Sequence, residues 1–267
     1  MKTIKKYTLA FVTATSFIFV GCSNTPAQTD LTATEIMQKV QEQYSNISSI
    51  NTNMTFNISN NSLNETMSLT LDMQTIKSPM KVDMTMEITS PESESPMSIS
   101  LYMDEEYLYM NFLDNWMKQP ITDEMKNSLN IDGAIQLVNP LSLQEVTFER
   151  KEDSTLNEKN VYVITATIDS SILESVLSQS TSLIPSTDSS SLDLDFSTIS
   201  DLEFDYYIDK ENYAPLKVST DLSDVFSQSG EEITGTLDMT FDQINSLTDI
   251  PLPDGASNAT DLSTITD

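Results

Sequence analysis

The first pattern after residue 30 is helical. Thr32 and Glu35 have the spacing of a capping box, and apolar residues then recur every three or four positions as far as Ile47. A period near 3.6 residues places these apolar side chains on one face of a helix. The pattern predicts an amphipathic helix that begins after Thr32 and buries that face.

Strict alternation of apolar and polar residues then replaces the helical period. The runs that alternate in this way are residues 51–58, 67–73, 80–88 and 97–103, followed by shorter runs at 107–112 and around Trp116. A period of two indicates strands with one apolar and one polar face, which is typical of antiparallel sheets. The segments between the runs are rich in Asn, Ser and Pro, which favour turns. We expect a meander of five or six strands.

The second half of the chain predicts more strands and two more helices. The strand-like runs are residues 143–148, 161–168, 202–208, 216–220 and 233–241. Helical spacing occurs at 122–138 and from Ser170 or Ser171 to residue 177. The segment 150–160 reads as a charged loop, and 178–201 is a Ser-rich, low-complexity stretch that predicts a mobile loop. The fold class expected from these elements is α+β.

The first thirty residues predict a leader and a tether. A basic start is followed by an apolar run, Thr8 to Val20, that is shorter than the roughly 20 residues of a membrane-spanning helix. Val20-Gly21-Cys22 then resembles the lipobox of bacterial lipoproteins, in which a peptidase cleaves before a cysteine that carries a diacylglyceryl group, although Phe19 stands where Leu is usual. The alternative is an ordinary secretory signal in which Cys22 is incidental.

On the lipoprotein interpretation the chain has four parts. Residues 1–21 are the signal peptide, 22–30 the acylated cysteine and a flexible tether, 31–255 a single folded domain, and 256–267 a disordered tail. The acylated Cys22 is the expected link to the cell membrane. This interpretation places the protein on the extracytoplasmic face of that membrane.

Composition removes several classes of function. The chain has no histidine and one cysteine, so it has no Ser-His-Asp arrangement, no disulfide and no zinc cage of thiolates. A formal net charge of -28, from 13 basic and 41 acidic side chains, opposes nucleic-acid binding. We assign no cofactor, no metal and no catalytic residue, and we expect a protein that is not an enzyme.

Acidic pairs invite a calcium or glycosidase site, and three groups of them occur. The groups are Asp193 with Asp195; Asp201, Glu203 and Asp205; and Asp221 with Asp224. None has the Asp-x-Asp-x-Asp-Gly spacing of a calcium loop. The alternating trio at 201–205 shares one face of a strand. We therefore expect these carboxylates to be solvated surface groups.

Two stretches carry a resemblance to a known family. The hairpin from Tyr207-Ile208-Asp209 to Pro215-Leu216-Lys217, and the closing Pro251-Leu252-Pro253-Asp254, resemble the half-barrel lipoproteins related to the carrier LolA. The similarity is greatest to the LppX and LprG type and to Gram-positive lipoproteins of unassigned function, over residues 31–260. It implies a curved antiparallel sheet, an incomplete, half-open barrel, covered by the N-terminal helix and two or more inserted helices. In that family the hollow holds acyl chains or apolar peptide parts.

Methionine is the most unusual residue in the composition, with 14 copies, most of them in the alternating runs. Its flexible, polarisable side chain suits adaptable binding surfaces. The predicted lining of an apolar cavity consists of Met67, Leu69, Leu71, Met73, Val82, Met84, Met86, Ile99, Leu101 and Met103. The alternative is that these side chains form an ordinary core beneath the helices.

Two hypotheses about function follow. The first is a membrane-anchored lipoprotein that binds a lipid, a lipoprotein or another apolar ligand in the half-barrel cavity. The second is an envelope sensor or protein-interaction lipoprotein, which meets a partner protein through its strand edges and its Ser-rich loop and holds no cavity ligand. The sequence identifies neither the ligand nor the partner protein.

Overall fold

The structure is a computed structural model that divides the chain into Met1–Leu31 and Thr32–Asp267. The residues that it describes are 31–91, 93, 95–122, 125, 146–169, 201–226 and 233–264. The fold reported below is that of the second unit.

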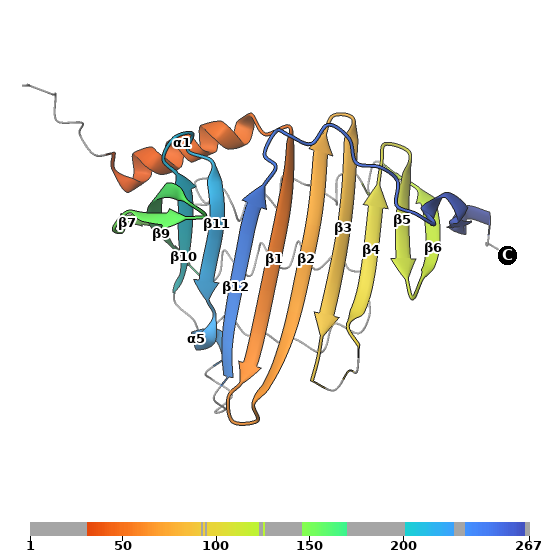
Figure 1. The fold of residues 1–267 in the computed structure, drawn as a ribbon, viewed down its shortest axis with the longest axis horizontal. Helices are drawn as coiled ribbons and strands as arrows, with labels where there is room; N and C mark the ends of the chain where they lie inside the picture. Colours follow the sequence, from red (N-terminus) through yellow and green to blue (C-terminus); the bar gives the residue numbers. More distant parts are fainter. Residues whose placement is uncertain are drawn as a thin grey trace, which may run out of the picture. The chain divides into compact units, whose positions relative to one another are not determined.

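In the described residues of this unit, one curved, unclosed sheet of 13 strands dominates (Figure 1). The strands are β1 Ser49–Asn60, β2 Glu65–Lys77, β3 Met80–Thr89, β4 Met97–Met103, β5 Tyr107–Phe112, β6 Asn115–Pro120, β7 Thr147–Arg150, β8 Ser154–Leu156, β9 Lys159–Asp169, β10 Asp201–Asp209, β11 Pro215–Asp221, β12 Ile233–Asp242 and β13 Thr260–Asp261. Their order is β13-β6-β5-β4-β3-β2-β1-β12-β11-β10-β9-β7, and β8 pairs with β9. The β13–β6 pair is parallel, and the other pairs are antiparallel.

The predicted meander is confirmed as β1 to β6, and the runs at 161–168, 202–208, 216–220 and 233–241 as β9 to β12. Of the run predicted at 143–148, only residues 147 and 148 belong to a strand, β7, and 143–145 lie outside the described residues. Pairing between β1 and β12, from Asn51 with Asp242 to Asn60 with Ile233, joins the two halves of the chain in one sheet. The expected charged loop at 150–160 is wrong in part, because Ser154 to Leu156 form β8 and pair with β9 through a tight turn at Asn157 and Glu158.

The N-terminal helix α1, Ala33–Ser45, begins as the capping box predicts. The Thr32 amide donates to the Glu35 carboxylate at 2.8 Å, and the Glu35 amide donates to the Thr32 hydroxyl at 3.3 Å. Its buried residues are Ala33, Ile36, Met37, Val40 and Tyr44. Lys39 lies 5.0 Å from the ring centre of Tyr213, in the β10–β11 turn. The helix therefore packs at the β10 side of the sheet.

Further helical structure among the described residues is short. It consists of α5 Ser223–Phe226 and the 3-10 turns η5 Ala256–Asn258 and η6 Leu262–Thr264. The two inserted helices expected at 122–138 and 170–177, and the mobile loop expected at 178–201, lie outside the described residues except at a few end positions. The part of the sheet that is described is accompanied by one long helix, α1.

The expectation of a disordered tail from residue 256 is wrong for residues 256–264. Ala256 is 1 % exposed and joins Ile250, Ile76, Tyr102 and Tyr109 in one buried cluster. The tail then adds β13 beside Met117 and Lys118 of β6. The dark blue segment in Figure 1 follows this course across the upper ends of the strands. Burial of the apolar side chains of Ile250 and Ala256 fixes this segment against the sheet, contrary to the expected disorder.

Candidate functional site

Strand register places apolar side chains in continuous rows on one side of the sheet. Residues directly opposite in an antiparallel pair point to the same side. The longest row, named the central row, crosses nine strands and consists of Phe112, Ile99, Met86, Leu71, Met54, Met239, Val218, Tyr206 and Ile164. We call the side of the sheet that carries this row the apolar face.

A second row runs beside the central row and is rich in methionine. It consists of Met117, Met110, Leu101, Met84 and Met73, from β6 to β2. All five side chains are half-buried. We call it the methionine row. Its neighbour toward the upper ends of the strands, the upper row, holds Leu108, Met103, Val82, Thr75 and Ile50, and is buried throughout.

The structure brings all ten predicted lining residues onto the apolar face of β2, β3 and β4. Val82 and Met103 are buried in the upper row, at 5 % and 1 % exposure, and the other eight are half-buried. Eleven of the 14 methionines lie on this face, at positions 54, 67, 73, 80, 84, 86, 97, 103, 110, 117 and 239. Their role as the lining of a cavity stays a prediction.

Sequence reasoning missed the contribution of the flanking strands. Met54 of β1 and Met110 of β5 extend the rows on either side of the predicted lining, and Met239 of β12 continues the central row. Alternation around each of these residues was visible in the sequence. The pairing of β1 with β12 was not, because alternation defines a face and says nothing about which strand lies next to it.

Exposure of the apolar face changes from one side of the sheet to the other. The central row is buried from Met239 to Ile164, where Tyr206 lies close to Tyr44 of α1. It is half-buried from Met54 to Ile99. Burial raises the pKa of the Tyr44 hydroxyl far above its usual value, with a further contribution from Tyr206. Among the described residues, the less buried part of the face is therefore the part carried by β1 to β6, where Ile121 and Met125 pack against the upper row.

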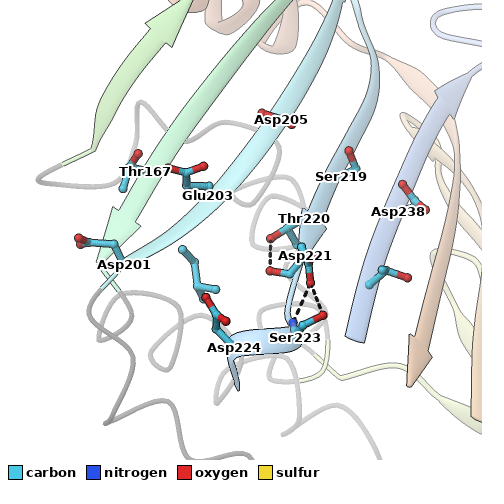
Figure 2. A pocket seen from close by; sticks show the side chains of 12 residues that line it. Thr167, Asp201, Glu203, Asp205, Ser219, Thr220, Asp221, Ser223, Asp224 and Asp238 are labelled. Atoms are coloured by element: carbon cyan, nitrogen blue, oxygen red, sulfur yellow. Dashed lines mark hydrogen bonds between the residues drawn. The ribbon is translucent and has the colours of Figure 1, made fainter. Parts of the chain in front are cut away.

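The opposite side, the polar face, carries an acidic hollow of about 630 Å³ (Figure 2). Its carboxylates are Asp201, Glu203, Asp205, Asp221, Asp224 and Asp238. Thr165 donates to Asp205 at 2.6 Å, and Lys217 lies 2.6 Å from Asp238. Hydrogen bonds from Ser223 lower the pKa of Asp221. These groups lie on the polar face, as the alternation at 201–205 predicts.

A second hollow on the polar face, of about 600 Å³, holds Asp72, Asp83 and Glu87. Burial, followed by the charge of Asp242, raises the pKa of Asp72. Burial, followed by the charge of Asp72, raises the pKa of Asp83. Among the residues the structure describes, no three acidic, His or Cys side chains converge to hold a metal ion.

Three predicted positions cannot be placed. Cys22, Asp193 and Asp195 lie outside the described residues, so acylation of Cys22 stays a prediction. None of the helices in the described part of the chain has the length and hydropathy of a membrane span.

Comparison with known proteins places most of the chain in one family model. The model, described as "Family of unknown function (DUF6612)", matches residues 32–261. No curated protein matches the sequence.

Several solved structures are similar to this chain at low identity. The Mycobacterium tuberculosis lipoprotein LppX is 12 % identical, with a TM-score of 0.49 over 81 % of this chain and 96 % of that chain. LprF from Mycobacterium bovis is 12 % identical, with a TM-score of 0.49 over 84 % and 97 %. An uncharacterized conserved protein from Thermus thermophilus is 12 % identical, with a TM-score of 0.33 over 86 % and 98 %. At TM-scores below 0.5 these similarities carry no argument about function.

Proposed function

Because the chain belongs to the DUF6612 family of unknown function, we propose a function from the geometry of its own sheet: it binds a lipid or another apolar ligand on the apolar face. The observation that carries this proposal is the central row, nine apolar side chains in register across nine strands. From Met54 to Ile99 that row is half-buried, and so is the whole methionine row beside it. Apolar surface of this extent favours an apolar cover.

The energetics suit a long hydrocarbon chain. Each methylene group removed from water contributes about 0.8 kcal/mol, so ten buried methylenes contribute about 8 kcal/mol before the costs of ordering. In the methionine row, Leu101 lies between Met110 and Met84, and Met73 lies beside Met84. Unbranched thioether side chains adjust to ligands of different shape, which supports a lining that accepts a class of lipids rather than one molecule.

The same proposal includes the site of action. Cys22 receives the diacylglyceryl group, and residues 23–30 tether the domain to the extracytoplasmic face of the cell membrane. Two acyl chains give stable anchoring, and they hold the apolar face close to a source of lipid. We assign the protein a binding role without catalysis.

Photo-crosslinking tests the binding proposal. The full chain in lipid nanodiscs is exposed to a diazirine-bearing C16 hydrocarbon probe, and adducts are mapped by mass spectrometry. We expect adducts on β2 to β5, and at least a fivefold loss of crosslinking in Met84→Gln. The matched control is Thr85→Gln, since Thr85 is the next residue of β3 and faces Ser100 on the polar face at 3.4 Å. Absence of adducts in the wild type, or equal losses in both variants, overturns the proposal.

A second candidate function, binding of a partner protein, rests on one end of the sheet. Leu63, Met97, Phe112 and Leu113 are 64, 42, 43 and 69 % exposed. They lie at the β1–β2 turn, the start of β4, the end of β5 and the β5–β6 turn, each at the lower end of its own strands in Figure 1. If this end binds a protein, Leu63→Ser with Leu113→Ser abolishes co-purification of a stoichiometric partner from membranes, and Met84→Gln preserves it.

A further inference from the structure

The upper row of the apolar face contains one polar side chain. Its members Leu108, Met103, Val82 and Ile50 are aliphatic and 1 to 6 % exposed, and Thr75 lies between Val82 and Ile50. Thr75 itself is 1 % exposed. It follows Met73 by two positions on β2, so the two side chains point to the same side of the sheet. Thr75 therefore lies at the buried edge of the half-buried methionine row.

Among the residues that the structure describes, none forms a hydrogen bond with the Thr75 hydroxyl. A buried hydroxyl normally has one, and leaving it without a partner is unfavourable. Valine has nearly the same shape and strand preference and would fill the row without this cost. The hydroxyl is thus a feature that packing and strand formation do not require.

We propose that the Thr75 hydroxyl binds the carbonyl oxygen of an uncharged fatty-acid ester whose chain lies along the methionine row. This inference rests on the proposed function. Thr75 donates an O–H, which suits a carbonyl acceptor. Three of its neighbours on the same face, Ile50, Met73 and Val82, carry no charge, and the fourth, Lys77, is exposed at the end of β2. A carboxylate or phosphate beside Thr75 would therefore be desolvated without a buried cation to compensate it. The ester is therefore favoured over an anionic lipid.

The test compares two probes of equal length on the full chain in nanodiscs. One is a diazirine-bearing hexadecane, and the other a diazirine-bearing methyl tetradecanoate. For Thr75→Val we expect unchanged half-saturation with the alkane and 2- to 10-fold weaker half-saturation with the ester, the range of one net hydrogen bond. Thr75→Ser keeps the hydroxyl and should keep the ester affinity.

A matched control deletes another buried hydroxyl that lacks a partner. Tyr44 of α1 is 5 % exposed, and its hydroxyl also has no hydrogen-bond partner within the described part of the chain. It lies beside Tyr206 of β10, four strands along the sheet from β2. Tyr44→Phe should leave half-saturation with both probes unchanged.

Each result has a defined meaning. Ester affinity that is unchanged in Thr75→Val, with both probes bound by the wild type, overturns the role of Thr75 and leaves the proposed function standing. Failure of the wild type to bind either probe overturns both. Equal weakening of both probes by Thr75→Val also overturns the ester contact, because it shows a change of packing.

Discussion

The Lys159 ammonium lies 2.9 Å from a carboxylate oxygen of Asp209, whose side chain is 5 % exposed while that of Lys159 is 51 % exposed. The other Asp209 oxygen accepts from the Glu211 amide at 2.9 Å. The contact ties the start of β9 to the end of β10. Lys159→Met should lower the free energy of unfolding by about 1–3 kcal/mol, because it leaves a buried carboxylate without its cation.

Urea unfolding followed by circular dichroism measures this effect. The control is Lys151→Met, which breaks a 2.7 Å pair with Glu149, a side chain that is 71 % exposed. A pair of that kind contributes about 0.2–1 kcal/mol. Equal losses in the two variants would show that burial of Asp209 does not matter.

Gly255 predicts a second stability effect, at the start of the structured tail. Its φ of +88° is a conformation that non-glycine residues rarely adopt, and an added Cβ would stand 3.2 Å from Cδ1 of Trp116. Gly255→Ala should lower the free energy of unfolding by about 1–3 kcal/mol. Trp116 is the single tryptophan, so its fluorescence should shift to the red as the tail loosens. Ser257→Ala, an exposed neighbour, is the control, and an unshifted spectrum in Gly255→Ala would contradict the prediction.

The elements that the sequence predicts well are those with local signals. The Thr32–Glu35 capping box places the start of α1, and alternation places the ten predicted lining residues on one face of β2 to β4. Both signals come from residues a few positions apart, where backbone geometry alone decides which side chains share a face. The same rule places Asp201, Glu203 and Asp205 together on the polar face.

The sequence has no such local signal for the pairing of distant strands or for how deeply each side chain is buried. Met54 and Met239 are paired across β1 and β12, yet they are far apart in the chain. The sequence around either residue does not identify its partner. The burial of Thr75 depends on its neighbours in the upper row, which come from β1 and β3. Threonine is compatible with either face of an alternating strand. The sequence therefore does not show that the Thr75 hydroxyl is buried, and the structure does.

Asp83 predicts how stability depends on pH. Its pKa is raised in the folded chain, by burial and then by Asp72, above the ordinary value of 3.8. The folded chain therefore binds this proton more tightly than the unfolded chain, and stability rises as the pH falls through the folded pKa toward 3.8. Asp83→Asn should raise the free energy of unfolding at pH 7 by about 0.2–1 kcal/mol and remove part of the gain on mild acidification.

Asp249 provides a control of opposite sign. The hydrogen bond from Lys81, at 2.6 Å, lowers the pKa of Asp249. The Lys81–Asp249 pair stabilises the folded chain fully above pH 3.8, and this stabilisation is lost as the pH falls through the lowered pKa of Asp249. Asp249→Asn should therefore destabilise the chain at pH 7 and have no effect below that pKa. Urea unfolding at pH 7, 5, 3.5 and 2 separates the two behaviours. The same sign for both variants at pH 7 would refute the assignment.

Cys22 predicts a covalent lipid. Metabolic labelling with an azide-bearing palmitate analogue should label the wild-type chain and leave Cys22→Ser unlabelled, because the proposal makes the thiol the acceptor of the diacylglyceryl group. Ser23→Ala, the next residue, should be labelled like the wild type. Label incorporation is a sharper measure than membrane fractionation, since an uncleaved leader with the apolar run Thr8 to Val20 could itself retain the variant at the membrane. Label on Cys22→Ser would place the acyl group elsewhere, and an unlabelled wild type would favour the alternative of an ordinary secretory signal.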